Sequence, residues 1–143
     1  MTVASILAQK GNAVITIGVF SKLSDVVDLL AENKIGAVVV TAPDGGIEGI
    51  VSERDVVRAM SQKGASALDD DTGEHMTHPV VHCSQTDTIN VVMEKMTAGR
   101  FRHVPVVTDG RLSGLISIGD VVKERIQQAE KDAEEMRAYI SAI

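Results

Sequence analysis

Two serine–aspartate pairs are the residues of this chain whose types and spacing could do chemistry. Ser52 precedes Asp55 by three positions, and Ser117 precedes Asp120 by the same interval 65 positions later. A serine three residues ahead of an acid, at the start of an apolar run, is an ordinary helix cap. The same pair can present a hydroxyl and a carboxylate to a ligand, and a helix N-terminus favours a nearby phosphate. Because the pattern occurs twice at matched positions, we favour a ligand role over capping alone.

The repetition extends beyond these pairs, so the elements that position them must occur twice. Residues 49–57 read Gly-Ile-Val-Ser-Glu-Arg-Asp-Val-Val, and residues 114–122 read Gly-Leu-Ile-Ser-Ile-Gly-Asp-Val-Val. Residues 35–40 align with residues 101–106 at nearly the same offset. A period of this length indicates two copies of one supersecondary unit, neither of which buries its apolar face alone.

Each copy is predicted to run strand, helix, strand, strand, helix. In the first copy these elements are predicted at residues 14–17, 24–36, 37–41, 47–51 and 52–63. In the second copy they are predicted at residues 80–83, about 89–96, 104–107, 112–116 and from 117 onward. We therefore divide the chain into residues 1–68 (first repeat with an N-terminal lead-in), 69–125 (linker and second repeat) and 126–143 (extension of the C-terminal helix).

Composition restricts the partners of the chain. Its 143 residues suit one compact domain or two fused half-domains, and 44% hydrophobic residues suffice for a core. Only 2% of the residues are aromatic, which argues against binding single-stranded nucleic acid by base stacking. The net charge of -6 opposes a phosphate-backbone partner, and no apolar run approaches the roughly 20 residues of a membrane span. For these reasons we expect no nucleic-acid or membrane partner. The single cysteine, Cys83, cannot form an internal disulfide, so we expect a cytoplasmic protein.

The repeat resembles a CBS domain, and about residues 1–125 resemble a stand-alone tandem CBS pair, or Bateman module. The resemblance is carried by both Gly-x-x-Ser-x-x-Asp motifs, the Val104-Pro105-Val106 strand, the glycine-turn hairpins and the element order. It implies an α/β (α+β) fold in which the two repeats pack by pseudo-twofold symmetry through their sheets. It also implies clefts between the repeats that bind adenosine-containing ligands such as AMP, ADP, ATP, NAD or S-adenosylmethionine.

The resemblance implies contacts to three parts of such a ligand. To the ribose it assigns the aspartates as acceptors and the serines as neighbouring hydroxyl donors: Ser52, Asp55, Ser117 and Asp120. To the phosphates it assigns Arg54, Arg102 and His103. To the adenine it assigns Thr16 and Ile17 in one copy, and His82 and Cys83 in the other.

The two copies differ at the phosphate positions. Arg102 aligns with Gly36, and Arg54 aligns with Gly119. The planar guanidinium fork pairs bidentately with phosphate oxygens, although a solvated surface cation is the alternative for both arginines. For His103 the alternative is a strand histidine whose hydrogen bonds are satisfied by the backbone. We therefore expect two chemically unequal clefts.

Four neighbouring residues suggest a metal site at first sight: His75, His78, His82 and Cys83. Their spacing fits no tight zinc signature, and the histidines straddle the start of a predicted strand at Pro79. We therefore expect no metal. The cysteine is more simply a small buried hydrophobe.

The C-terminal extension carries an apolar stripe. From Val122 its members follow at alternating steps of four and three: Ile126, Ala129, Ala133, Met136, Ile140 and Ile143. Such a 3.5-residue repeat is the seam of a helix packed along another helix. We expect a homodimer to which these tails contribute. The alternative is that the stripe docks on its own chain, against Val3, Ile6 and Leu7.

Together these features predict a non-catalytic regulatory sensor of adenine nucleotides. Binding of AMP, ADP, ATP or NAD between the repeats would change the shape or assembly of the module, and an unidentified downstream protein would read the change. An enzyme is one alternative, although nothing resembles a nucleophile with its base, a paired acid and base, or a metal catalytic centre. A structural interaction scaffold with vestigial clefts is the other. Nucleotide binding without turnover distinguishes the sensor from both.

Overall fold

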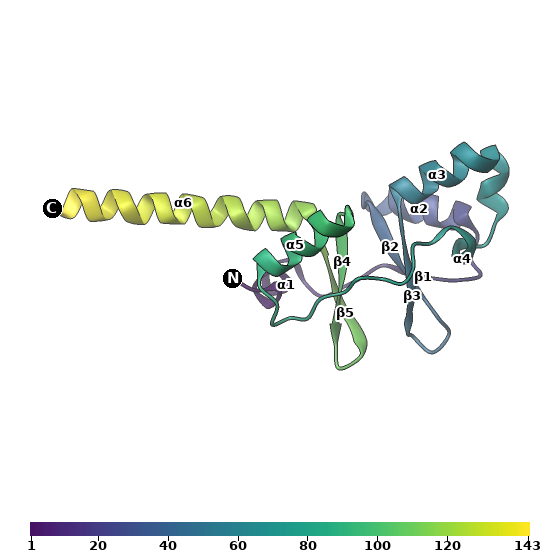
Figure 1. Ribbon diagram of the computed structural model, residues 1–143, viewed down its shortest axis with the longest axis horizontal. Coiled ribbons are helices and arrows are strands. Elements are labelled where there is room, and N and C mark those ends of the chain that lie inside the picture. Colours follow the sequence, from purple (N-terminus) through teal and green to yellow (C-terminus); the bar gives the residue numbers. More distant parts are fainter.

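The computed structural model of the chain describes residues 1–143 and contains two small sheets flanked by helices, with one long helix projecting from the body (Figure 1). The first part contains α1 (Val3–Lys10), β1 (Thr16–Gly18), α2 (Leu23–Asn33), β2 (Ala37–Thr41), β3 (Ile47–Ser52) and α3 (Glu53–Lys63). The 3-10 helix η1 (Gly64–Asp69) and α4 (Thr72–His75) then lead to α5 (Ile89–Gly99), β4 (His103–Thr108), β5 (Arg111–Ser117) and α6 (Ile118–Ala142). This arrangement confirms the predicted mixed α/β fold class with a C-terminal helix.

The first repeat forms its predicted sheet in full. The central strand β2 pairs in parallel with β1 and antiparallel with β3. Val38, Val39 and Val40 in this strand are all fully buried. A strand covered on both faces carries a continuous apolar run rather than an alternating one, which explains the sequence of β2.

The predicted strand at residues 80–83 is wrong, because only Cys83 pairs with β4. Its N–H donates to the Pro105 carbonyl at 2.9 Å, and its carbonyl accepts a hydrogen bond from β4 at 2.8 Å. In the first repeat the ladder continues, since the Val39 N–H donates to the Ile15 carbonyl at 3.3 Å. The counterpart of Val39 is Pro105, which has no N–H to donate. One proline thus removes the bond that would extend the strand.

The core of each repeat is completed by an exchanged segment. In the sequence this segment lies just before the other repeat. The helix α1 lies before the first repeat, but its Val3, Ile6 and Leu7 are buried in the core of the second repeat. The short helix α4 lies before the second repeat, but it contacts β3, and the following Met76 packs against the core of the first repeat. The two repeats therefore cannot separate without opening both cores.

The two motif glycines hold these exchanged segments close to the strands. A β-carbon on Gly114 would lie 2.8 Å from Leu7 Cδ2. A β-carbon on Gly49 would lie 2.5 Å from Met76 Sδ and 2.9 Å from the Thr77 carbonyl oxygen. Both positions therefore need glycine for close approach.

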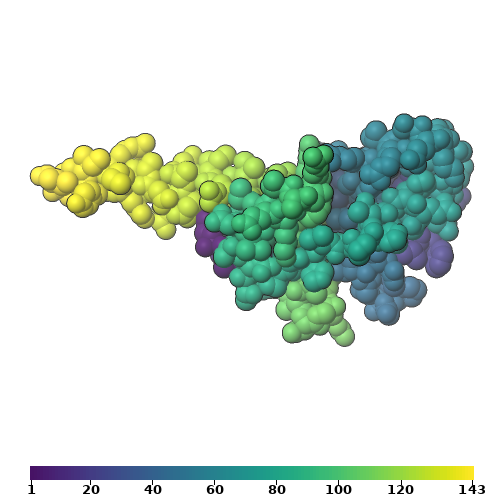
Figure 2. Space-filling model, in the orientation of Figure 1, coloured from purple at the N-terminus to yellow at the C-terminus, as the bar shows by residue number.

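The helix α6 leaves the body within its first turns and then extends away from it, as Figures 1 and 2 show. Val121 and Glu124 are buried against the second repeat, whereas every residue from Ala129 to Ile143 is exposed. The alternative in which the apolar stripe docks on α1 of its own chain is therefore not found. None of the helices, α6 included, has both the length and the apolar composition needed to cross a bilayer.

Replacing Gly114 with alanine is expected to destabilise the fold, because the added methyl group overlaps Leu7 in a filled core. The expected loss is about 1–3 kcal/mol in the free energy of unfolding, the usual cost of overpacking. Gly18→Ala is the matched control, since its methyl group would meet only Ser21 Oγ at 3.7 Å. Chemical denaturation of both variants measures the difference. Equal losses would mean that α1 does not press on the motif strand.

Candidate functional site

A cleft between the two repeats is the main candidate site. Its cavity has a volume of about 790 Å3 and is lined by the β3–α3 junction, residues 77 and 79–81, the loop after α5 and the β5–α6 junction. In Figure 2 the teal and green second repeat abuts the blue first repeat on this body. The predicted ribose and phosphate residues that line the cavity are Ser52, Arg54, Asp55, Arg102, His103 and Ser117.

Asp55 supplies a buried carboxylate to this cleft. The Ser52 N–H donates to Asp55 Oδ2 at 2.8 Å, and the Asp55 N–H donates to Ser52 Oγ at 3.4 Å, so the pair caps α3 reciprocally. The other oxygen, Oδ1, accepts a hydrogen bond from Thr77 Oγ1 at 3.0 Å and lies 3.1 Å from the Arg58 guanidinium. Asp55 is only 4% exposed, so these donors offset the cost of burying its charge. The motif therefore caps the helix and lines the cleft at once.

The matching aspartate, Asp120, is engaged differently. Ser117 caps α6 with it in the same reciprocal way. In addition, Lys10 Nζ lies 2.6 Å from Asp120 Oδ2 and 2.7 Å from the Leu115 carbonyl oxygen. Burial raises the pKa of Asp120, but hydrogen bonds from Lys10 and from Ser117 outweigh burial and hold this pKa below its usual value. Asp120 does not line the main cavity, and the chain's own ammonium group neutralises it.

Four arginines line the cleft, although the chain as a whole carries a net charge of -6. Arg58 pairs with Asp55, whereas Arg54, Arg100 and Arg102 form no ion pair with a carboxylate. Arg54 Nη1 donates to the Arg100 carbonyl oxygen at 3.2 Å, which links α3 of the first repeat to the end of α5 in the second. Unpaired guanidinium groups in a cleft suit the bidentate recognition of phosphate.

Two of these arginines were not predicted from the sequence. Arg58 follows Arg54 by four positions, so the helical period predicts that both lie on one face of α3. The four-residue spacing could therefore have identified Arg58 from the sequence. Arg100 offered no comparable signal, because it ends α5 in a left-handed conformation with a φ of 55°.

His103 contributes a neutral imidazole to the cleft. Burial, followed by the nearby charge of Lys10, lowers the pKa of this histidine below its usual value, so it is uncharged at pH 7. A β-carbon on Gly36 would lie 3.1 Å from His103 Cε1. The glycine of the first repeat therefore leaves room for the imidazole of the second.

The residues assigned to the adenine do not line this main cavity. Thr16 and Ile17 lie in β1, and Cys83 is only 2% exposed because its pairing with β4 turns its side chain into the second core. Burial, with the charge of Asp87, raises the pKa of Cys83 to about 11, so the thiol stays protonated. His82 lines a smaller cavity of about 360 Å3. The apolar residues that do line the main cavity are Ile50, Val57, Pro79, Val80, Val81, Phe101 and Ile118.

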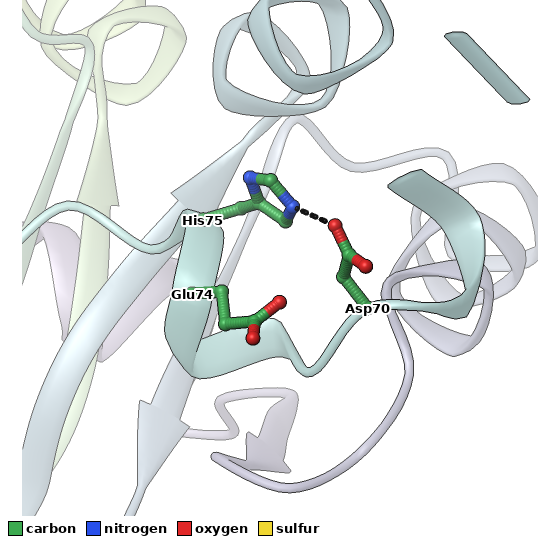
Figure 3. Close-up of side chains that lie close together, drawn as sticks. All are labelled: Asp70, Glu74 and His75. Carbon is green, nitrogen blue, oxygen red and sulfur yellow. Dashed lines mark hydrogen bonds and ion pairs between the residues drawn. The ribbon is translucent and has the colours of Figure 1, made fainter. Parts of the chain in front are cut away.

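A second cluster of polar side chains lies outside the cleft, around η1 and α4, where the His75 ring points toward Asp70 (Figure 3). Asp70 Oδ2 is 2.8 Å from His75 Nε2 and 2.7 Å from Lys63 Nζ. Potential ligand atoms of Asp70, Glu74 and His75 lie within 4.8 Å of one another. Because Lys63 and His75 already engage the Asp70 carboxylate, we interpret the cluster as an ion-pair clamp. Of the four residues considered above as metal ligands, only His75 belongs to it.

Comparison with known proteins identifies the family. A sequence model of the CBS domain matches residues 9–62 and 73–126. The chain belongs to the CBS domain family. The two repeats recognised in the sequence are thereby confirmed as CBS domains, and residues 127–143 of α6 lie outside both matches.

Solved structures of other CBS proteins share this fold. The CBS-domain containing protein ATU1752 from Agrobacterium tumefaciens is 48% identical, with a TM-score of 0.85 over 87% of this chain and 92% of that chain. The CBS domain protein PAE2072 from Pyrobaculum aerophilum, complexed with AMP, is 31% identical, with a TM-score of 0.75 over 84% of this chain and 89% of that chain.

A curated relative is longer than this chain. The protein named CBS domain-containing protein CBSX3, mitochondrial, of Arabidopsis thaliana is 32% identical over 120 residues. The aligned region is 81% of this chain and 58% of the Arabidopsis protein. The CBS pair thus spans little more than half the length of that relative.

The Asp70 clamp predicts a pH-dependent contribution to stability. Hydrogen bonds from Lys63 and then from His75 hold the pKa of Asp70 below its unfolded value. The charged form therefore stabilises the fold above about pH 4, and this contribution is lost as the pH falls through the folded pKa. Asp70→Asn should lower the melting temperature at neutral pH and have a smaller effect in acid.

Thermal denaturation of the wild type and of Asp70→Asn, from about pH 3 to about pH 7, measures this difference. Asp71→Asn is the control, because Asp71 precedes α4 without a side-chain capping bond. A melting-temperature difference that is constant across this pH range would contradict the clamp.

Proposed function

We propose that this CBS protein is a non-catalytic sensor of anionic adenosine nucleotides, such as AMP, ADP, ATP or NAD, which bind in the cleft between its repeats. One observation carries the proposal. A single cavity combines the buried carboxylate of Asp55 with three arginines that have no carboxylate partner, Arg54, Arg100 and Arg102. Carboxylates accept hydrogen bonds from sugar hydroxyls, and guanidinium groups donate to phosphate. The cleft therefore complements both the ribose and the phosphate of a nucleotide.

The ribose contact would supply a large share of the affinity. Each hydrogen bond from a vicinal hydroxyl to the Asp55 carboxylate contributes about 1.5–3 kcal/mol. A micromolar dissociation constant corresponds to about 8 kcal/mol. Two such bonds would therefore account for roughly half of a micromolar affinity, and the phosphate and adenine contacts for the rest.

The charge of the cleft favours phosphate-bearing ligands over S-adenosylmethionine. The sulfonium centre of that ligand is positive, and it would lie in a cavity whose four arginines outnumber its two carboxylates, Glu53 and Asp55. Like charges repel more strongly in a partly desolvated cleft than in water. The relative from Pyrobaculum aerophilum, which is complexed with AMP, supports the same ligand class.

The cleft is also joined to α6 at the first turn of that helix. Ser117 caps α6, and Ile118 and Gly119 line the cavity. A ligand that contacts both repeats and this turn binds one arrangement of them more tightly, and so shifts the population toward it. A partner protein would read the shift through the position of α6.

The two alternatives, an enzyme and a scaffold, can be distinguished from the sensor by experiment. An enzyme would turn the nucleotide over, but the two serines of the cleft cap helices, neither is hydrogen-bonded to His103, and the lone thiol is buried. A scaffold with vestigial clefts would not bind nucleotide. Binding without turnover supports the sensor. We retain a cytoplasmic location as part of the proposal, since it suits a chain with one unpaired cysteine.

The phosphate contact is tested by Arg102→Ala. This variant should weaken binding of AMP at least about tenfold but change adenosine binding little, because adenosine lacks the phosphate that the guanidinium would hold. Raised salt should mimic part of the loss. Arg111→Ala, at an exposed position of β5 away from the cavity, is the matched control. Calorimetry with both ligands measures the effect. Equal losses for AMP and adenosine would mean that Arg102 supports only the fold.

The two motif aspartates should behave unequally. Asp55→Asn should weaken AMP and adenosine alike, by about tenfold or more, because it removes the charge that accepts the ribose hydroxyls. Asp120→Asn should leave this site unchanged, since Asp120 is engaged by Lys10 outside the main cavity. If Asp120 binds a ribose, it therefore does so in a second cleft and not in the main cavity. Unchanged calorimetric affinities in the double variant would overturn the ribose assignment of both residues.

A further inference from the structure

The outer part of α6 is a helix without a partner. Every residue from Ala129 to Ile143 is exposed, and Figures 1 and 2 show this part of the helix projecting beyond the body. Helices in proteins derive most of their stability from packing an amphipathic face, and short isolated helices are marginal in water. The apolar side chains on this segment therefore suggest a missing contact.

Those side chains form one continuous stripe. Its large members are Val122, Ile126, Met136, Ile140 and Ile143, which are 49%, 53%, 58%, 63% and 90% exposed. Ala129 and Ala133 fill the remaining steps of the 3.5-residue repeat. Val121 and Glu124, which hold α6 on the body, lie outside the stripe. The helix α6 can therefore stay packed on the body through Val121 and Glu124 while its stripe packs against a second helix.

We propose that residues 122–143 pair with the same segment of a second copy as a parallel, in-register, two-stranded coiled coil. The a positions of the heptads are then Ile126, Ala133 and Ile140, and the d positions are Val122, Ala129, Met136 and Ile143. Two of the three a positions hold isoleucine, the β-branched type found at a in parallel two-stranded coiled coils. The alanines allow the two helix axes to come close.

The charged residues beside the stripe select this orientation. In a parallel pair each residue at position g faces the residue about five positions further along the partner. Arg125 then faces the partner's Glu130. Asp132 likewise faces the partner's Arg137. Both contacts join opposite charges, and the twofold symmetry of the pair repeats each of them.

The antiparallel pair that aligns residues 122–140 brings like charges together and leaves Ile143 outside the overlap. Glu130 would face the partner's Glu130, and Asp132 the partner's Asp132. Lys123 would face the partner's Arg137. Shifting the antiparallel pair by one heptad joins Glu130 to the partner's Arg137 but leaves Val122 outside the overlap. The parallel pair alone uses the whole stripe with opposite charges on both flanks.

Analytical ultracentrifugation of the full chain tests whether the stripe holds a dimer. The wild type should be a dimer, and Ile126→Glu with Met136→Glu should raise the dissociation constant at least about tenfold, because it places charges in the seam. Gln127→Glu with Ala138→Glu is the matched control, since both positions are exposed and lie off the stripe. A monomeric wild type, or a stripe variant that dimerises as tightly as the control, would overturn the proposal.

Cysteine cross-linking tests the orientation. Ile140→Cys places a thiol at an a position near one end of the stripe, where the two copies meet in a parallel pair but lie more than about 15 Å apart along the axis in an antiparallel one, so mild oxidation should give a covalent dimer. Ala138→Cys, on the outer face of the same helix turn, should cross-link far more slowly. The native thiol, Cys83, is buried and does not compete. Cross-linking of Ile140→Cys no faster than Ala138→Cys would overturn the parallel arrangement.

Discussion

The exchange of lead-in segments between the two CBS domains is the constraint on which the rest of this structure depends. The helix α1 completes the second core, and α4 with the residues after it completes the first. Each segment also ends beside the motif acid of the repeat that it joins. Thr77 donates a neutral hydroxyl to Asp55, whereas Lys10 brings an ammonium group to Asp120. The exchange therefore builds one compact body and at the same time makes its two acids unequal.

This inequality determines what the cleft can bind. Asp55 lies among hydrogen-bond donors and the Arg58 guanidinium, and three arginines without a carboxylate partner lie in the same cavity. A site that combines a buried carboxylate with several guanidinium groups discriminates by charge, even though the protein as a whole is acidic. Ligands that carry both hydroxyls and phosphate match it, whereas neutral or cationic adenosine derivatives leave the arginines unpaired. Both acids have a cationic neighbour, but Arg58 reaches Asp55 from its own helix and lines the cleft, whereas Lys10 reaches Asp120 from the exchanged helix α1.

The local pattern of the sequence predicted much of this structure, and the features that it missed depend on contacts between distant residues. The β-branched run of β2, the serine caps of α3 and α6 and the paired motifs all lie where their periodicity and capping signals indicate. The predicted strand at residues 80–83 failed because Pro105, in a different strand, lacks the N–H that would pair with it. The contact of Lys10 with Asp120 spans most of the chain, so no local pattern could reveal it. Arg58, by contrast, lies one helical turn after Arg54 and was predictable.

A crystal structure of the protein with saturating AMP tests the central claim most directly. We expect one nucleotide in the cleft, with its ribose hydroxyls on Asp55, its phosphate among Arg54, Arg100 and Arg102, and the contact between Lys10 and Asp120 intact. A nucleotide bound at Asp120 with Lys10 displaced, or an empty cleft at saturating AMP, would contradict this account.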